Sequence, residues 1–491
     1  MLENISLKNF KSFRDLPELN IRPLTILCGA NSSGKSTLLK SALTLKQSYT
    51  SSSTYDTLIL NGELANNGFF EDVTFQGVAD EFSLSHTFFL QNPFDENRKM
   101  KIKTANIQTY KAFRKIFLDT KDYPDSFEIK TSSTFKSNKG NNLGKTPIIQ
   151  KYSLEITMRT SGHETISKII MERKDETNFA LEWDNIPDTQ HTFVSGKVSQ
   201  CVAYFYGLQL GNVYIYVRNL PKDTIIANIL PNIYTLCKLA ADQYQRISFL
   251  GPLRQAPARA YTYTNETLSI GTMGEYTPFI LAQNKNKNIK AVLPGIINGK
   301  LTLQASNTTL LNATQKWLSY MNIDRINIDQ HSELVKLKVG NSNIADVGFG
   351  VSQVLPIIIE GLSILPEQTL ILEQPEIHLH PNMQMCLADF LISLVKSGKQ
   401  VIVETHSDHI INRLIRRMME EEDTYLLDNS SIYYVAKNSD ESRVVPIIID
   451  KVHGIAKCPE DFFTQYSSEV DLIVRTGFDN IRKGQFNNAS N

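Results

Sequence analysis

The sequence has few features of a secreted, disulfide-linked or membrane-spanning protein. Its five cysteines are scattered and form no CxxC pair, so neither a disulfide framework nor a zinc ribbon is expected. The longest mostly apolar stretch, residues 202–217, contains Gln, Asn and two Gly and is too polar for a membrane span. The first residues alternate polar and apolar side chains without a signal-peptide core. We therefore expect a cytoplasmic protein that does not enter a membrane.

The chain also lacks an excess of either charge. Its 51 Lys and Arg residues balance 51 Asp and Glu residues. The length of 491 residues predicts two or three structural units. Because proteins that neutralise many phosphates are usually basic, direct DNA contact would require a local patch or a partner. Residues 91–150 carry 12 basic and 6 acidic side chains. A solvated insertion is the simpler interpretation of this segment, and a surface for nucleic acid or an acidic partner is the alternative.

A glycine-rich loop near the N-terminus lies between a predicted strand and a predicted helix. Residues 24–28 form a short apolar run, typical of a strand buried on both faces, and residues 35–47 continue at helical spacing. The loop between them, residues 29–36, matches the pattern G-x-x-x-x-G-K-[ST]. Backbone N–H groups of such a loop bind a polyphosphate, and the helix directs its positive end at the same anion. The sequence therefore predicts a nucleotide site.

The chemistry of this loop assigns a role to each of its residues. Lys35 is expected to reach the β and γ phosphates, and the Ser36 hydroxyl is expected to ligate Mg²⁺. ATP and Mg²⁺ are therefore the predicted cofactors. The other residues expected to line the nucleotide site are Asn31, Ser32, Ser33, Gly34 and Thr37.

A second predicted strand ends in an acidic cluster. Aliphatic residues 369–372 are followed by Glu373, Gln374, Pro375 and Glu376. A P-loop site needs an acidic group at a strand end to hold Mg²⁺, and we assign this role to Glu373. The next position normally carries the carboxylate that polarises the attacking water, but here it is Gln374, which orients water without accepting its proton. Hydrolysis is therefore expected to be slow unless Glu376 serves as the base.

Residues 400–406 form a third predicted strand, which ends at His406. In this context His406 is expected to approach the γ-phosphate as a hydrogen-bond donor, and a structural histidine is the alternative. The spacings of His378, His380, His406 and His409 also fit a metal site. Histidines of a dimer interface and a switch are the favoured interpretation of this set.

The order of these motifs resembles that of ABC-type ATPases of the SMC/RecF branch. Residues 347–353 (VGFGVSQ) follow the P-loop, and LILEQPEIHLHP and VETHSDHI come after them. The set is most similar to the OLD-like (overcoming lysogenization defect) group of the AAA15/AAA21 class, in which GFGVSQ replaces the transporter signature LSGGQ. The resemblance implies that Ser352 contacts the γ-phosphate bound by a second subunit. It also implies a homodimer or a higher homo-oligomer formed through the ATPase heads.

The resemblance further implies an α/β fold, with a P-loop NTPase head of the ABC type, similar to SMC and RecF heads. We expect a mixed sheet in this head and an inserted α+β lobe. The predicted divisions are the N-terminal part of the head at 1–80, the lobe at 81–334, the C-terminal part of the head at 335–460 and a tail at 461–491.

The segment after the last motif favours a regulatory role. Only 82 residues follow His409, and they contain no D-x-D, which the Toprim domain of OLD nucleases requires, so the chain is not expected to be a nuclease. It resembles the ATPase halves of two-gene anti-phage systems: PtuA of Septu, accompanied by an HNH nuclease, and AriA of PARIS, accompanied by a Toprim effector. A DNA-clamping ATPase of the RecF/SMC kind is the alternative function. A transporter ATPase ranks third because of the long insertion and the missing LSGGQ.

Overall fold

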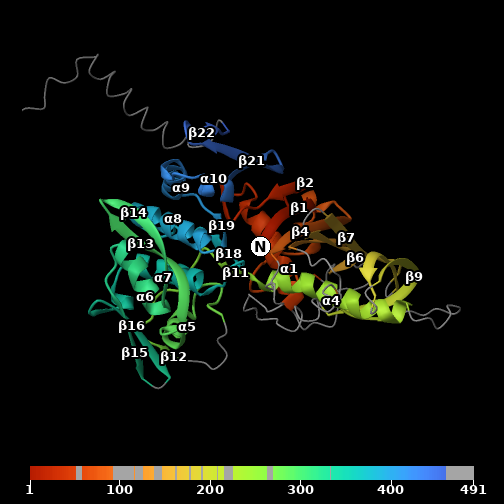
Figure 1. Cartoon of the computed structure of the whole chain (residues 1–491), viewed down its shortest axis with the longest axis horizontal. Helices are drawn as coiled ribbons and strands as arrows, with labels where there is room; N and C mark the ends of the chain where they lie inside the picture. Colours follow the sequence, from red (N-terminus) through yellow and green to blue (C-terminus); the bar gives the residue numbers. More distant parts are fainter. Residues whose placement is uncertain are drawn as a thin grey trace, which may run out of the picture.

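The structure, a computed structural model, contains two large β-sheets with helices on both sides of one of them (Figure 1). It describes residues 1–50, 58–91, 116, 125–137, 146–160, 163–175, 178–188, 192–206, 208–214, 225–262, 269–331 and 333–459. The predicted tail at 461–491 and much of the basic segment 91–150 lie outside the described residues.

The first sheet has nine strands, and all neighbouring strands in it are antiparallel. In β5 and β6, buried and partly exposed residues alternate, so this sheet has one apolar face. Its strands in spatial order are β10 (Gln209–Tyr214), β9 (Phe193–Tyr206), β8 (Asn178–Pro187), β7 (His163–Arg173), β6 (Pro147–Thr160), β5 (Ser126–Ser137), β4 (Glu81–Gln91), β1 (Leu2–Phe10) and β2 (Phe13–Asn20).

The second sheet has seven strands and is the core of the head. Its first five strands are parallel and the last two pairings are antiparallel, which confirms the predicted α/β fold with a mixed sheet. Every residue of the three central strands β18, β19 and β3 is buried. The spatial order is β11 (Ile247–Leu250), β18 (Thr369–Glu373), β19 (Gln400–Glu404), β3 (Leu24–Cys28), β20 (Ser430–Asn438), β21 (Glu441–Asp450) and β22 (Gly454–Lys457).

Helices cover both faces of the core sheet. Ile371 and Ile402 belong to the hydrophobic core shared with the nine-stranded sheet, whereas Leu370 and Leu372 belong to a second core, as the alternation of side chains along a strand requires. The first core includes α1 (Lys35–Thr50) and α4 (Ile225–Gln245), and the second includes α7 (Phe349–Ser363), α8 (Pro381–Lys396) and α9 (Asp408–Glu420). No helix within the described ranges combines the length and the apolar character needed to cross a bilayer.

A smaller group of elements packs beside α7 and α8 (Figure 1). The Trp317 ring meets the Phe390 ring edge-on at a centroid distance of 5.1 Å, which joins α6 to α8. These elements are β12 (Tyr261–Thr262), α5 (Thr277–Asn284), β13 (Asn288–Ile297), β14 (Lys300–Thr309), α6 (Leu310–Tyr320), β15 (Ile326–His331), β16 (Leu334–Val339), β17 (Ser342–Asn343) and η2 (Ile344–Asp346). The remaining short helices are α2 (Phe70–Val73), η1 (Phe75–Gly77) and α10 (Tyr425–Asn429).

Strand pairing crosses the limits of the predicted lobe at 81–334. β4 lies in the lobe segment and pairs with β1 of the predicted head, and β11 pairs with β18 to complete the core sheet. Each pairing provides hydrogen-bond partners for backbone N–H and C=O groups that would be unpaired on an edge strand. The middle of the chain therefore contributes strands to both large sheets, and the domain limits stay a prediction.

Candidate functional site

The P-loop leaves the C-terminal end of β3 and leads into α1, as the sequence predicts. Gly29 has a φ of 133° and Gly34 a φ of 106°, conformations that residues with a Cβ rarely adopt. A Cβ on Gly29 would also collide with the backbone oxygen of Val435 on the adjacent β20. The loop conformation and its close approach to β20 therefore both require glycine at position 29.

The loop borders an open cavity of about 470 Å³, a volume typical of small-molecule sites. The structure brings all the predicted loop residues to this cavity, together with the ends of β18 and β19. The lining consists of Lys11, Ser12, Asn31, Ser32, Ser33, Gly34, Lys35, Ser36, Thr37, Gln374, Glu404 and His406. Of the predicted site residues, Glu373, Glu376 and Ser352 do not line it.

Lys35 is folded into the loop that precedes it. Its amine donates hydrogen bonds to the carbonyl oxygens of Gly29, at 3.0 Å, and Ala30, at 2.8 Å. Burial lowers the pKa of the Lys35 amine, and the nearby Glu404 carboxylate opposes this effect. The amine thus donates to carbonyl oxygens of the loop. The oxygens of a bound phosphate could accept the same hydrogen bonds.

Ser36 contacts a carboxylate to which the sequence analysis assigned no role. Its hydroxyl donates a hydrogen bond of 2.9 Å to Oε1 of Glu404, the last residue of β19. Glu373 was the predicted acidic partner in the metal site, but β19 lies between β18 and the P-loop strand β3. The order of the strands therefore places Glu404 closer to the loop. The sequence does show that Glu404 ends an apolar run, and this pattern could have marked it as a second acidic candidate. It does not show that this strand lies next to the P-loop strand.

Glu373 and Glu404 nevertheless form a pair, because they are opposite each other in the register of β18 and β19. Strand alternation puts them on the same face as Ile371 and Ile402, toward α1. Burial and the charge of Glu404 raise the pKa of Glu373 to about 7. Burial also raises the pKa of Glu404, and the hydrogen bond from Ser36 counteracts this shift.

The oxygen atoms of these residues fit a divalent cation. Glu373 Oε1 and Glu404 Oε2 are buried and have no hydrogen-bond partner among the described residues, whereas buried polar atoms normally have one. Mg²⁺ in nucleotide sites uses one or two carboxylates, supplemented by waters and phosphate oxygens. Ser36, Glu373 and Glu404 can supply the protein ligands. The described part of the chain holds no cluster of three or more His, Cys, Asp or Glu side chains suited to a metal.

Arg254 fixes the end of β18, a role that the sequence analysis missed. Its buried guanidinium donates to the backbone carbonyls of Gln374, at 3.1 Å, and Glu373, at 3.3 Å. Gln374 has a φ of 42°, which is uncommon for a residue with a side chain. Its N–H donates to the Glu404 carbonyl at 2.7 Å. These bonds hold Gln374 in the conformation in which it lines the cavity.

Glu376 and His406 are joined behind the cavity. Oε1 of Glu376 accepts a hydrogen bond of 2.7 Å from the backbone N–H of His406. Glu376 therefore positions the turn after β19, while the His406 side chain lines the cavity. Burial and the charge of Lys35 lower the pKa of His406, so its ring is neutral at neutral pH.

The other predicted histidines lie on the loop before α8 and on α9. The His378 ring packs against the Phe349 ring at a centroid distance of 5.9 Å. His380 caps α8, since its Nδ1 accepts a hydrogen bond of 3.3 Å from the Asn382 N–H. His409 lies in the first turn of α9. Only His406 of the four predicted histidines lines the P-loop cavity.

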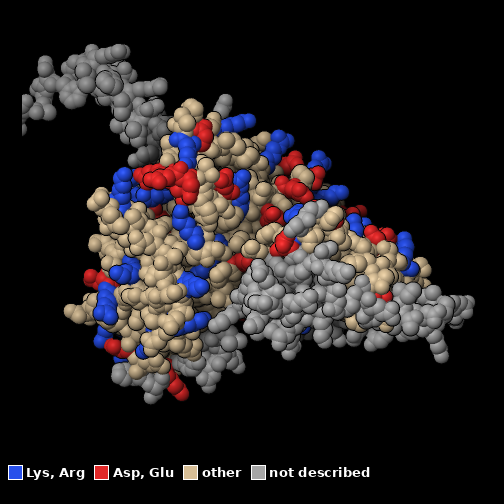
Figure 2. All heavy atoms as spheres, in the orientation of Figure 1, with Lys and Arg blue, Asp and Glu red and all other residues tan. Residues whose placement is uncertain are grey.

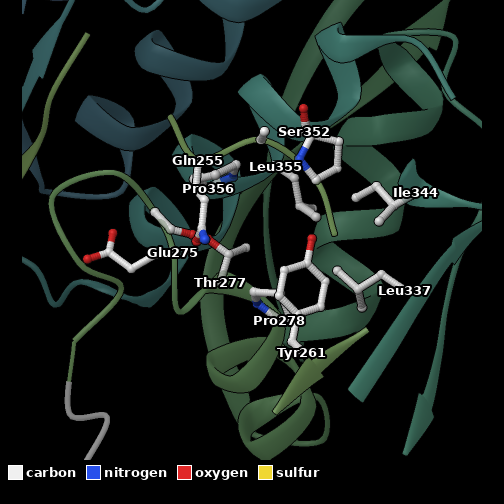
Figure 3. Close-up of a pocket in the computed structure, with 13 residues that line it drawn as sticks. Gln255, Tyr261, Glu275, Thr277, Pro278, Leu337, Ile344, Ser352, Leu355 and Pro356 are labelled. Atoms are coloured by element: carbon white, nitrogen blue, oxygen red, sulfur yellow. The ribbon is translucent and has the colours of Figure 1, made fainter. Parts of the chain in front are cut away.

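Ser352 lies apart from the P-loop cavity of its own chain. Its hydroxyl donates a hydrogen bond of 2.7 Å to the Phe349 carbonyl within the first turns of α7. Figure 3 shows it next to Leu355 and Pro356, at a second cavity of about 20 Å³ that Tyr261 and Thr277 also line. That volume admits a water and excludes a nucleotide. The predicted contact of Ser352 with a nucleotide of a second subunit stays a prediction.

Solved structures similar to this chain are head domains of SMC proteins. A search of curated proteins returned no match. The SMC head domain from Thermotoga maritima is 12% identical, with 91% of this chain and 99% of that chain covered and a TM-score of 0.37. A Pyrococcus furiosus Smc head domain with an extended coiled coil, bound to the C-terminal domain of ScpA, is 11% identical, with coverages of 91% and 96% and a TM-score of 0.37. These similarities are too low to support an argument about function.

The family comparison covers most of the chain. Residues 1–411 match the model described as the AAA ATPase domain, AAA_15. The match includes the P-loop, the acidic end of β18 and the turn with His406, which the structure gathers around one cavity. The protein therefore belongs to the AAA ATPase domain family.

Proposed function

We propose that this protein is a slowly hydrolysing regulatory ATPase of a two-component anti-phage defence complex. In this proposal, ATP-dependent association of two heads controls a partner nuclease or effector. The observation that supports it most directly is the cavity in which Lys35, Ser36 and Glu404 face Gln374, with no carboxylate at the position of the expected base.

Nucleotide binding follows from the donors around this cavity. Lys35 exchanges the carbonyls of Gly29 and Ala30 for phosphate oxygens, and the N–H groups at the start of α1 face the same anion. Ser36, Glu373 and Glu404 hold Mg²⁺, which neutralises phosphate charge when it is bound. His406, neutral at neutral pH, offers a ring N–H to the terminal phosphate.

Slow turnover follows from the partners of the nearby carboxylates. Gln374 orients water but cannot take its proton, and general-base catalysis typically contributes ~10²–10⁴-fold. Glu404 accepts a hydrogen bond from Ser36, and Glu376 accepts one from the His406 backbone. One oxygen of each carboxylate is held by this partner, which fixes the side chain, whereas Gln374 lines the cavity at the position expected for the base. The protein is therefore proposed to act as a switch and not itself as a nuclease.

Association of two copies is supported by exposed apolar side chains at the start of α7 and on the loop after β11. Phe349 is 53% exposed and Leu253 is 66% exposed. The loop with Leu253 is tied to the loop with Met273, because the Gln255 N–H donates to the Met273 carbonyl at 2.9 Å. Exposed groups of large apolar side chains favour a protein interface. In the proposed association, the start of α7 of one copy, with Ser352, faces the P-loop cavity of the other copy, as the resemblance to ABC-type heads implies.

The partner nuclease, of the HNH or Toprim type, is proposed from the resemblance to the Septu and PARIS ATPases. The alternative, a RecF/SMC-like ATPase that binds DNA in repair, calls for a basic surface. Figure 2 shows basic and acidic side chains interspersed on the face that it displays. The cytoplasm is the proposed location, because the cysteines of the described residues are free thiols.

Light scattering of the full chain with ATP and Mg²⁺ tests the association. We expect the mass to double when ATP is added to the wild type, and to stay at that of one chain for Lys35→Ala. Phe349→Asp should bind ATP but fail to associate. An ATP-bound wild type with the mass of a single chain would refute the two-copy mechanism. Co-purification with the product of the neighbouring gene then tests the partner, which should be an HNH or Toprim protein.

A further inference from the structure

We propose that the free edge of strand β14 is a docking site for an extended segment of a partner protein that has acidic residues at both ends. The segment binds as a third strand of the hairpin formed by β13 and β14. The inference goes beyond the proposed function, because no residue of this hairpin lines the P-loop cavity and the binding needs no nucleotide.

The hairpin has one strand that packs on the body of the protein and one strand on its outer side. β13 contacts α6, α7 and α8, and its residue Ala291 belongs to the second core. β14 pairs with β13 and with no other described strand. Figure 1 shows both strands on the side of α7 and α8 that faces away from the nine-stranded sheet. One long edge of β14 is therefore open to a further strand.

The turn of the hairpin fixes its hydrogen-bond pattern. Asn298 and Gly299 have φ values of 51° and 74° and connect the strands as a two-residue turn. Such a turn makes the residues on either side of it, Ile297 and Lys300, a hydrogen-bonded pair. Hydrogen-bonded pairs then recur at every second position of the ladder.

This pattern shows which backbone groups of β14 are free. The Leu310 N–H donates to the Lys287 carbonyl at 3.0 Å, in step with the series that begins at the turn. The alternate residues of β14 therefore direct their N–H and C=O groups away from β13. No backbone hydrogen bond from these groups to another described residue is found. The residues are Leu301, Leu303, Ala305 and Asn307.

The hairpin blocks one of its edges against strand addition and leaves the other bare. Pro294 occupies a position of β13 at which the backbone nitrogen faces outward, and Gly295 follows it. Residues 301–309 of β14 contain no charged residue, no Pro and no Gly, and their register has no bulge. The edge strand β2, by contrast, carries three charged residues and one Pro. Because natural sheets use such residues to block exposed edges, the bare edge of β14 indicates a docking site.

Apolar side chains beside this edge favour apolar residues in the added strand. Ile296 is 60% exposed and Ile297 is 52% exposed at the tip of the hairpin. Ile296 is paired with Leu301, and Pro294 with Leu303, so these four side chains share one face of the hairpin. Every second side chain of an added strand would contact this face, as in other complexes formed by strand addition.

The charges of this region favour an acidic partner over a second copy of the chain. Lys287 and Lys290 lie at the base of the hairpin and Lys300 lies at its tip, whereas residues 284–309 contain no acidic residue. None of the ion pairs between described residues includes these lysines. Two copies of the edge would bring like charges together. A segment with acidic groups at both ends would instead place opposite charges at each end of the edge.

The test uses a fluorescein-labelled peptide of sequence DDTVTVTVTDD, whose binding to the nucleotide-free full chain is measured by fluorescence anisotropy. We expect saturable binding to the wild type. Ala305→Pro removes an outward N–H without breaking a bond to β13, so it should weaken binding at least tenfold. Lys300→Glu should weaken binding at least threefold. The control Lys316→Ala, a change of an exposed lysine on α6, should leave binding unchanged.

Two altered peptides test the chemistry of the segment. DDTVTPTVTDD interrupts the strand, and KKTVTVTVTKK reverses the charge of its ends, so each should bind at least tenfold more weakly than the first peptide. Equal binding of all three peptides, no binding to the wild type, or wild-type affinity in Ala305→Pro would overturn the proposal. So would a nucleotide-free wild type with twice the mass of Ala305→Pro, because a second copy would then occupy the edge.

Two further measurements keep this test separate from folding and from the proposed function. Thermal unfolding shows whether Ala305→Pro is folded. If it is not, Ala305→Glu, which puts a negative charge on the exposed edge, provides the same comparison. Lys35→Ala should bind the peptide as the wild type does. A wild type that binds ATP but not the peptide would refute the docking site alone, whereas one that binds the peptide but not ATP would refute only the proposed function.

Discussion

The Ser36 hydroxyl donates a hydrogen bond to Glu404 across 368 positions of the sequence, at a distance of 2.9 Å. This contact joins the first turn of the P-loop helix α1 to the strand β19, which ends next to His406. The residue proposed to bind Mg²⁺ and the turn that carries His406 are thereby mechanically linked. A change at the phosphate end of the cavity therefore reaches the His406 turn directly.

Substitution of Gln374 tests the slow-switch account. Gln374→Glu restores a carboxylate at the cavity lining, so single-turnover hydrolysis of bound ATP should accelerate, by up to ~10²–10⁴-fold if the new group acts as a full general base. Rapid mixing of ATP–Mg²⁺ with protein in molar excess over the nucleotide measures this rate. A rate unchanged from the wild type would show that proton transfer does not limit hydrolysis.

Glu376→Gln tests whether Glu376, and not a water oriented by Gln374 alone, supplies the general base for hydrolysis. Because Oε1 of Glu376 accepts the His406 N–H, an amide oxygen can keep that bond, and we expect hydrolysis to change less than threefold. Fast hydrolysis by the wild type that collapses in Glu376→Gln would identify Glu376 as the base. That outcome would end the slow-switch interpretation.

Gly29→Ala tests the backbone of the P-loop. The φ of 133° and the collision of a Cβ with the Val435 oxygen predict a loss of at least about 2 kcal/mol of unfolding free energy. Gly350→Ala, in the first turn of α7 with only ordinary contacts around its added Cβ, is the control and should cost little or slightly stabilise. Chemical denaturation measures both variants, and equal effects would contradict the assigned conformation of Gly29.

His86 predicts a loss of stability in acid. Its ring is buried between the Ser41 and Tyr244 hydroxyls, at 3.1 Å from each, and burial lowers its pKa to about 3. The unfolded chain takes up this proton below about pH 6.5, whereas the folded chain does not. Stability is therefore highest above pH 6.5 and falls toward pH 3, by roughly 2 kcal/mol at pH 5 from this group.

The measurement for His86 is denaturant unfolding at pH 7.5 and pH 5 for the wild type and His86→Gln. The variant has no titrating ring, so it should lose less stability than the wild type on acidification. The same loss in both proteins would show that His86 does not contribute to the pH dependence.

Local features of the head could be predicted from the sequence because they depend on neighbouring residues. The strand predicted at 24–28 is β3, and the helix predicted at 35–47 lies within α1. The apolar run gives the strand, and the two glycines permit the loop between them. The loop residues and Gln374 also meet at one cavity.

Long-range features could not be predicted in this way. The insertion of β19 between β18 and β3 makes Glu404, and not Glu373, the partner of Ser36. Arg254 reaches the end of β18 from a loop 119 residues earlier in the sequence. The pairing of β1 with β4, a strand from the middle of the chain, is likewise a long-range contact. No local pattern of residues encodes any of these contacts.

The central claim is that ATP binds at this P-loop and that the Lys35 amine is the main positive group that holds its phosphates. Equilibrium binding of a fluorescent ATP analogue to the wild type and Lys35→Ala tests this claim most directly. The account predicts saturable binding to the wild type and at least tenfold weaker binding to Lys35→Ala. Lys437→Ala, on the exposed end of β20, should bind as the wild type does. Wild-type affinity in a folded Lys35→Ala protein would contradict the account.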